Sequence, residues 1–423
     1  MAAAPAEEDK GFCFIWMNKR KIDMDLSICI IAKNEELNIK RCLDSLIPYG
    51  FQIVVVDTGS TDHTKEIALH YTDDVYHFDW NNNFSEARNF AISKCINTYV
   101  MSMDCDECIE YIDVEKLENM LEEKNGQVGR IKIKNLLTHN GEEQVNIDWI
   151  NRIFSKKLFH YEGRIHEQVT AIDGHAYEVY QAPVVILHTG YNLPEKERKQ
   201  KADRNIGLLH EELQHLLITF LQKENQESYI TNYSAMKDLQ SNKKQCVEQI
   251  NSIIDMENDL SIKLQHDEQL PYILYQLGKS CYTVGDYTEA CIYFSCALSF
   301  DLNPKLEYVI DMVETYGYAM LNDGQAANAL FFENIYEEFG NTADFKFLMG
   351  LIYMNNAHFK AAVTEFLEAT SYSECKMVGV NSYMAFYNMG VIYECIGRTD
   401  DAIRYYKMCG EYEPAEKRIE VLK

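Results

Sequence analysis

Between residues 26 and 104 the chain alternates short apolar runs with amphipathic stretches. The runs Leu26–Ala32 and Gln52–Asp57 consist mainly of apolar residues, as expected of strands buried on both faces of a sheet. The stretches that follow carry apolar residues at helical spacing, as at Leu37, Ile39 and Leu43. Since apolar strands that alternate with amphipathic helices form parallel β-α-β units, we predict an α/β domain. Its expected strands are residues 26–32, 52–57, 73–80 and 98–104, and its expected helices are residues 35–47, 63–71 and 84–95.

Beyond about residue 190 the pattern changes to helical periodicity alone. Residues 195–221 place apolar side chains on one face of a long helix. Residues 274–304 then carry glycine, tyrosine, alanine, aromatic and proline positions in the order of a tetratricopeptide unit, and residues 346–370 and 386–409 repeat it. The equivalent glycines recur near the expected period of about 34 residues, with a degenerate second unit: Gly278, Gly317, Gly350 and Gly390. Because such helix pairs bury their apolar faces only by stacking, we predict an all-α array with a concave groove that holds a peptide or protein segment.

Length and composition narrow the class of protein. A chain of 423 residues with 47% hydrophobic residues can bury two or three domains. We expect a tail at 1–24, an α/β domain at 25–195, a helical linker at 196–270 and the repeat domain at 271–423. The formal charge of −26 repels nucleic acids and anionic membrane surfaces, and no apolar stretch approaches the roughly 18 residues of a membrane span. Thirteen scattered cysteines and an N-terminus without the pattern of a signal peptide favour a reduced, cytoplasmic protein.

Acidic residues follow directly on the last predicted strand. In a strand, residues i and i+2 face the same side, so Asp104 and Asp106 are expected to face the surface together and to hold one hard divalent cation that bridges a diphosphate. A solvated acidic loop is the alternative. A redox pair of Cys105 and Cys108 is a second alternative, although C-x-x-C motifs of the thioredoxin type open a helix rather than end a strand.

The ordered motifs IIAKNEE, VVVDTGSTDHT, FSEARNFAI and MSMDCDE together resemble family 2 glycosyltransferases of the GT-A fold, over roughly residues 26–190. The resemblance implies inverting transfer of a sugar from a nucleotide diphosphate donor, with Mn²⁺ or Mg²⁺ held by Asp104 and Asp106. It also implies that Asp57 accepts a hydrogen bond from uracil or ribose and that Glu35 lies beside the nucleoside. Capping of helices is the structural alternative for acids at such positions.

The same resemblance assigns roles around the diphosphate. Arg88 of FSEARN would bind the diphosphate bidentately, with a surface salt bridge to Glu86 or an aspartate as the alternative. His188, after a second apolar run, would be a third metal ligand, although a histidine there is more often structural. The basic run 196–204 would suit a lid over the phosphates, with Arg204 as its contact, or else forms a solvated helix face.

Inverting transfer also needs a carboxylate that takes the proton of the acceptor. The segment RIHEQ lies where family 2 sequences carry their catalytic acid, so Glu167 is the candidate base and His166 an orienting or metal-linked group. A thiol acceptor needs less help than a hydroxyl, because a free cysteine with a pKa of about 8.5 is already partly ionised at neutral pH.

The combination with a helical array narrows the resemblance. The HTGY and KADRN stretches and the helical tail are similar to bacterial S-glycosyltransferases that modify bacteriocin precursors of the sublancin type. This resemblance implies transfer of a hexose, glucose from UDP-glucose, onto a Cys or Ser of a ribosomal peptide held by the array. Alternatives are a lipopolysaccharide or lipid-linked acceptor, a homodimer contact as the role of the array, and a scaffold without catalytic activity.

Overall fold

The computed structural model describes residues 24–139, 142–189, 195–224, 239–256 and 258–423. Nearly all of the expected tail, residues 1–23, lies outside the described residues. Contacts divide the chain into two compact units, Met1–Asn192 and Leu193–Lys423.

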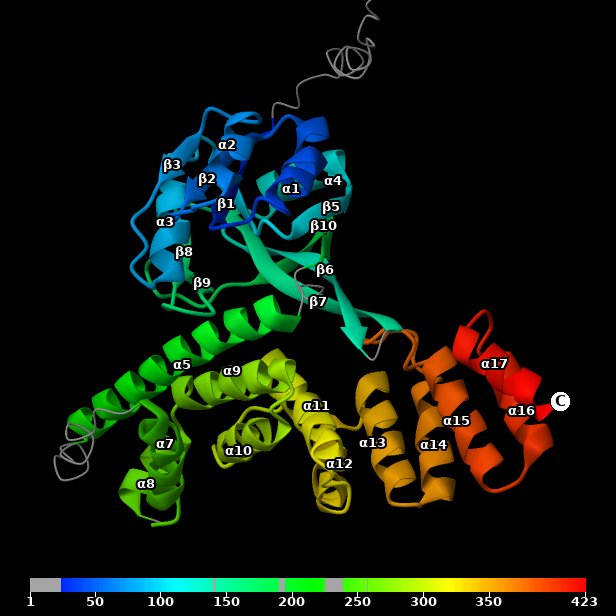
Figure 1. The fold of residues 1–423 in the computed structure, drawn as a ribbon. Coiled ribbons are helices and arrows are strands. Elements are labelled where there is room, and N and C mark those ends of the chain that lie inside the picture. The colour runs from blue at the N-terminus through cyan, green and yellow to red at the C-terminus, as the bar shows by residue number, and fades with distance from the viewer. Residues whose placement is uncertain (1–23, 140–141, 190–194, 225–238, 257) are drawn as a thin grey trace, which may run out of the picture. The chain divides into compact units, whose positions relative to one another are not determined.

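The first unit begins with alternating strands and helices and ends in a series of strands (Figure 1). Its elements are β1 (Leu26–Ala32), α1 (Ile39–Leu46), η1 (Ile47–Tyr49), β2 (Gln52–Asp57), α2 (Thr64–Leu69), β3 (Val75–His77), α3 (Phe84–Lys94), β4 (Tyr99–Met103), β5 (Glu107–Ile112), α4 (Val114–Glu123), β6 (Val128–His139), β7 (Glu142–Ser155), β8 (Phe159–Glu162), β9 (Gln168–Ala171) and β10 (Val179–His188).

Eight of these strands form one mixed sheet in the order β3-β2-β1-β4-β7-β6-β10-β5. Strands β3, β2, β1 and β4 run parallel to one another, as the β-α-β pattern predicts, and β7 then pairs antiparallel with β4. Apolar side chains of β1 and β2 enter cores on both faces of the sheet. Strands β8 and β9 form a separate antiparallel hairpin. The carboxyl ends of β1, β2 and β4 therefore share one edge, where the polar motifs lie.

The second unit is helical among its described residues. Its elements are α5 (Glu195–Lys223), α7 (Leu239–Ile254), α8 (Asp259–Gln265), α9 (Gln269–Val284), α10 (Tyr287–Ala297), α11 (Glu307–Asn322), η3 (Asn328–Ile335), α12 (Tyr336–Phe339), α13 (Ala343–Asn355), α14 (Phe359–Ala369), α15 (Tyr383–Cys395), α16 (Thr399–Met408) and α17 (Glu413–Leu422). The long helix α5 packs against α9 and buries an apolar face that includes Leu209, Leu213 and Leu217. None of the described helices combines the length and the apolar character needed to cross a bilayer.

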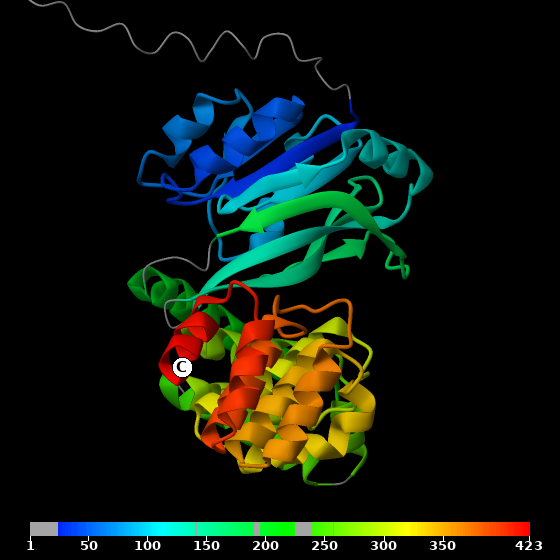
Figure 2. The ribbon, with the colours of Figure 1, turned by 90° about the vertical axis from the view of Figure 1, so that its right-hand side faces the viewer.

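Consecutive helices from α13 to α16 stack side by side (Figures 1 and 2). The predicted α/β domain followed by an all-α repeat array is thus confirmed. The second repeat is irregular because the 3₁₀ helix η3 and the short α12 follow α11 in place of a full second helix. In the regular repeats the equivalent glycines allow close helix packing: a Cβ on Gly278 would lie 2.6 Å from the ring of Phe294, and one on Gly350 would lie 2.5 Å from that of Phe366.

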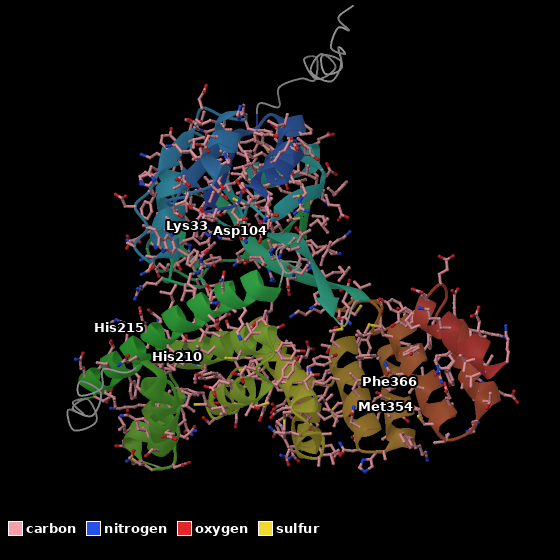
Figure 3. All side chains as sticks on the ribbon, in the orientation of Figure 1. Lys33, Asp104, His210, His215, Met354 and Phe366 are labelled. Atoms are coloured by element: carbon pink, nitrogen blue, oxygen red, sulfur yellow. The ribbon has the colours of Figure 1, made fainter. Side chains whose placement is uncertain are left out.

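A Gly350→Ala substitution should therefore destabilise the array, since the added methyl group collides with Phe366 of α14 (Figure 3). We expect a loss of about 1–3 kcal/mol, the usual cost of overpacking. Gly207→Ala is the matched control, because nothing lies within 4 Å of its Cβ position on α5, and it should stabilise by roughly 0.5–1 kcal/mol. Urea unfolding followed by helical circular dichroism tests the contrast, and equal effects of the two substitutions would refute it.

Candidate active site

The acids after β4 lie in a turn and not in the strand. Strand β4 ends at Met103, and β5 begins at Glu107. The i, i+2 argument therefore does not describe Asp104 and Asp106, and the expected surface exposure was wrong for Asp106. The Asp104 side chain is 35% exposed, whereas that of Asp106 is only 7% exposed. The two carboxylates have different partners.

Asp104 is held by two buried arginines (Figure 3 labels Asp104). Arg88 of α3 donates from Nη2 to Oδ1 at 2.8 Å, and Arg152 of β7 donates from Nη2 to Oδ2 at 3.1 Å. Arg152 also donates to Glu107 Oε1 at 3.2 Å. Burial would raise the pKa of Asp104, but the two guanidinium charges outweigh it and hold that pKa well below its usual range. Asp104 is consequently ionised, with both oxygens bound to arginine.

Asp106 faces His188 instead. His188 Nε2 lies 3.5 Å from Asp106 Oδ2, and His188 Nδ1 lies 2.7 Å from Asn135 Oδ1. The amide of Asn135 is oriented by Asp148, which accepts from its Nδ2 at 2.7 Å. Because Asn135 Oδ1 can only accept, Nδ1 of His188 carries a proton and Nε2 faces Asp106. Burial lowers the pKa of His188, but Asp106, Glu107 and Asp104 outweigh it and raise the pKa, so this place favours positive charge.

These residues fit a divalent cation in part. No group of three or more His, Cys, Asp or Glu side chains is arranged to hold a metal ion anywhere in the described parts of the chain. Asp106 and His188 offer an oxygen and an imidazole nitrogen that face each other. The carboxylate suits Mg²⁺ or Mn²⁺, whereas imidazole is more typical of later transition metals. The remaining ligands would have to come from phosphate and water, as is usual for Mg²⁺-type sites. Asp104, with both oxygens bound to arginine, fits a direct ligand less well.

Glu167 is carried by the β8–β9 hairpin. Gly163 and His166 of its loop adopt positive φ angles of 98° and 54°, which tighten the turn before Glu167. The Glu167 side chain is 12% exposed, and its Oε1 accepts from Arg88 Nε. Thus Arg88 is buried and bound to Glu167 and Asp104 of the protein itself. Of the two alternatives for a salt bridge, the structure has the aspartate and not Glu86, although the pair is buried on the arginine side. The expected contact of Arg88 with a diphosphate stays a prediction.

The acids expected near the nucleoside also shape the loops. Asp57, buried at the end of β2, accepts from the backbone N–H of Ser60 at 3.1 Å and lies 3.7 Å from His77. Glu35 Oε2 accepts from Asn38 Nδ2 at 2.8 Å. Asp62 accepts at 3.0 Å from the backbone N–H of Thr64, the first residue of α2, although the N-cap position itself is His63 and not Asp62. Contacts of Asp57 and Glu35 with a nucleotide remain predictions.

The thiols and the basic run have simpler surroundings. Cys105 and Cys108 are both free thiols, and burial raises the pKa of each, which opposes a reactive redox pair. Arg204 is exposed on α5 of the second unit and lies 3.2 Å from Asn205 Oδ1. Its role as a phosphate contact stays a prediction, as does the role of His166.

Three residues of the site were not anticipated: Arg152, Ser102 and Asn135. Arg152 lies in a run whose pattern predicts only a strand, and the sequence carries no signal that it faces Asp104. Asn135 and Glu107 come to His188 through strand pairing, since His188 of β10 is the register partner of Asn135 in β6 and of Glu107 in β5. Such neighbours depend on long-range pairing, which local periodicity does not encode.

Most of this site lies in a part of the chain that matches a known protein family. Residues 27–185 match the model of Glycosyl transferase family 2. The chain is 28% identical over 189 residues to the prophage-derived glycosyltransferase SunS of Bacillus subtilis, a match that covers 44% of each chain. It is 37% identical over 82 residues to a TPR repeat-containing protein of Synechococcus elongatus, covering 19% of this chain and 20% of that protein. The chain thus spans less than half the length of these curated relatives.

A solved structure, that of TarS from S. aureus, aligns with a TM-score of 0.34 at 17% identity, covering 64% of this chain and 55% of that one. The motifs between residues 26 and 190 predict a family 2 domain, and the family model confirms it. The match to Glycosyl transferase family 2 thus spans residues 27–185 of this chain.

Proposed function

We propose that the protein is an inverting, metal-dependent glycosyltransferase that moves a hexose from a UDP-sugar onto a Cys or Ser side chain of a ribosomal peptide. The observation that supports it best is the gathering of Asp104, the Asp106–His188 pair and Glu167 near one edge of the sheet, with buried Arg88 joining Asp104 to Glu167. The family of residues 27–185 and the likeness to SunS support the same reaction class.

On the donor side, the chain supplies charge of both signs. Asp106 and His188 would hold the divalent cation, which would neutralise the departing diphosphate. Asp104 is kept ionised by Arg88 and Arg152, so it can accept hydrogen bonds from the donor at its exposed side. Asp57 would accept a hydrogen bond from the nucleoside.

On the acceptor side, Glu167 takes the proton. Within the described parts of the chain, Glu167 accepts a hydrogen bond from Arg88 at Oε1 and none at Oε2, which leaves Oε2 for the acceptor. The acceptor oxygen or sulfur then attacks the anomeric carbon from the face opposite the diphosphate, and the C–O bond to the diphosphate breaks, so the anomeric configuration inverts.

The direct test incubates the full-length protein with a panel of UDP-sugars and two matched peptides that differ only by Cys or Ser at one position. Intact mass should show addition of one hexose to a peptide, and the anomeric configuration by NMR should be opposite to that of the donor. Donor hydrolysis without peptide modification, but with transfer to a lipid or lipopolysaccharide acceptor, would select that alternative. A protein that binds no UDP-sugar would be a scaffold.

The helical array is the proposed acceptor-binding part. Most of its tyrosines pack against other rings, as in the stacked pair Tyr393–Tyr405 and the edge contact of Tyr272 with Tyr308, so they serve the fold first. A truncation near residue 270 would uncover the apolar face of α5, because α9 packs on it. Charge, rather than truncation, is therefore the better variable to test.

Raising the salt concentration should increase the KM for a peptide that carries Lys or Arg, because the acidic chain attracts it through screened long-range charge. The KM for the UDP-sugar should change far less. The control is the same peptide with its basic residues replaced by glutamine, whose KM should be insensitive to salt. Equal salt dependence for both peptides would remove charge from acceptor recognition.

A further inference from the structure

One buried guanidinium touches two of the acids that the proposed reaction uses, Asp104 and Glu167. Arg88 is 5% exposed and lies in the first half of α3. Its Nη2 donates to Asp104 Oδ1 at 2.8 Å, its Nε donates to Glu167 Oε1, and its Nη1 donates to Ser102 Oγ at 2.6 Å. Each of its three nitrogens is therefore bound to a different strand or loop of the site.

We propose that Arg88 is a positioning residue that sets the distance between Asp104 on the donor side and Glu167 on the acceptor side. This role rests on the proposed glycosyltransferase function. Two carboxylates near one another repel, and each would otherwise move independently on its own turn. A guanidinium is planar and holds its donors in a fixed geometry, so it fixes the relative position of the groups it binds. Misplacement of a reacting group by about 1 Å can cost a factor of about 10² in rate.

The residues on either side of Arg88 in α3 also hold the hairpin that carries Glu167. Asn89 donates to Tyr161 O at 2.8 Å and accepts from Tyr161 N at 2.9 Å, so it caps the backbone of β8. The backbone N–H of Phe84 donates to Arg164 O at 2.8 Å, in the loop before Glu167. These two contacts hold the hairpin backbone, and Arg88 adds the contact to the side chain that would act. Helix α3 thus connects the hairpin with the turn after β4.

Arg152 provides an internal comparison. It is also buried, and it also binds Asp104, at 3.1 Å, but its second carboxylate is Glu107. In the described parts of the chain, neither a hydrogen bond nor an ion pair joins Arg152 to Glu167. Lysine in place of either arginine keeps the positive charge but cannot bridge two acids in a fixed geometry. The two arginines therefore separate an effect on Asp104 from an effect on Glu167.

Two double-mutant cycles on the full-length protein test the proposal: Arg88→Lys with Glu167→Gln, and Arg152→Lys with Glu167→Gln. Arg88→Lys should lower kcat by about 10²-fold with little change in the donor KM, since Arg152 still holds Asp104. If Arg88 acts through Glu167, its substitution should cost nothing further once Glu167 is glutamine. The Arg152→Lys and Glu167→Gln effects should instead multiply.

If the wild type transfers sugar but the effects of Arg88→Lys and Glu167→Gln on kcat multiply, the proposed role of Arg88 is wrong. A wild type that transfers none overturns the proposed function, and this role with it. Should Arg88→Lys fail to fold, Ser102→Ala replaces it, because it removes the acceptor of Nη1 and leaves the charge in place. Its loss of kcat should vanish in the Glu167→Gln background, and a loss that persists there would overturn the role of Arg88.

Discussion

Replacement of Asp106 by asparagine should remove sugar transfer, with a fall of more than about 10³-fold, the scale of losing a main electrostatic stabiliser of the transition state. Asparagine keeps the size of the side chain, which matters because Asp106 is only 5% exposed. It removes the charge opposite His188 Nε2, where the cation would bind. Chelation of metal in the wild type should reproduce the loss, and Mn²⁺ affinity, measured by calorimetry with UDP present, should fall in parallel.

Asp73→Asn is the matched control, because Asp73 is exposed and belongs to the same unit. It should leave transfer unchanged. Asp104→Ala is a poorer test of catalysis than the sequence suggests, because it leaves Arg88 and Arg152 buried without the carboxylate that they share. Breaking a buried ion pair costs about 3–5 kcal/mol of stability. Full activity in the presence of EDTA would remove the metal from the mechanism.

Glu167→Gln should lower kcat by about 10²–10⁴-fold on a serine peptide, the range for loss of a general base. Glutamine can still accept from Arg88 through its amide oxygen, so the hairpin should keep its place and the affinity for UDP should stay near that of the wild type. The fall on a cysteine peptide should be smaller, because a thiol with a pKa of about 8.5 supplies some thiolate by itself.

Single-turnover measurements with the two matched peptides check this difference, since they report the chemical step and not product release. Glu115→Gln is the matched control and should behave like the wild type, because it makes the same chemical change at an exposed residue in the first turn of α4. A Glu167→Gln variant that keeps more than half of its rate on both peptides would move the search for the base to His166.

The sequence predicts the first, second and fourth strands closely because each contains a continuous apolar run, whereas the third, expected at residues 73–80, is only Val75–His77. Strands β1 and β2 begin and end at the predicted residues, whereas α1 begins four residues later than residue 35. The late start has a tertiary cause. The backbone N–H of Glu35 donates to Thr64 Oγ1 at 2.7 Å, so the loop is bound to the start of α2 before the helix α1 begins.

The candidate site could be predicted in its composition but not in its pairings. The acids after β4 and the His-Glu pair are visible as motifs, yet the turn at Asp104 and the ion pairs of Arg88 depend on tertiary contacts. Arg152 reaches Asp104 only because β7 pairs antiparallel with β4, with Ile153 opposite Met101. No local pattern reports that register, so a residue important to the site looks like an ordinary strand arginine.

The β8–β9 hairpin, which carries the proposed base, is a separate element from the sheet whose edge carries the proposed donor-binding residues. Asp104, Asp106 and His188 belong to the large sheet or to turns at its edge, whereas Glu167 rides on a two-stranded element outside that sheet. Insertions or exchanges between residues 163 and 167 would therefore change which acceptor fits without altering the strands that hold the donor. Under the proposed function, new acceptor specificities could arise by variation of this one short loop, provided that Glu167 still contacts Arg88 and that Asn89 keeps its hydrogen bonds to Tyr161 of β8.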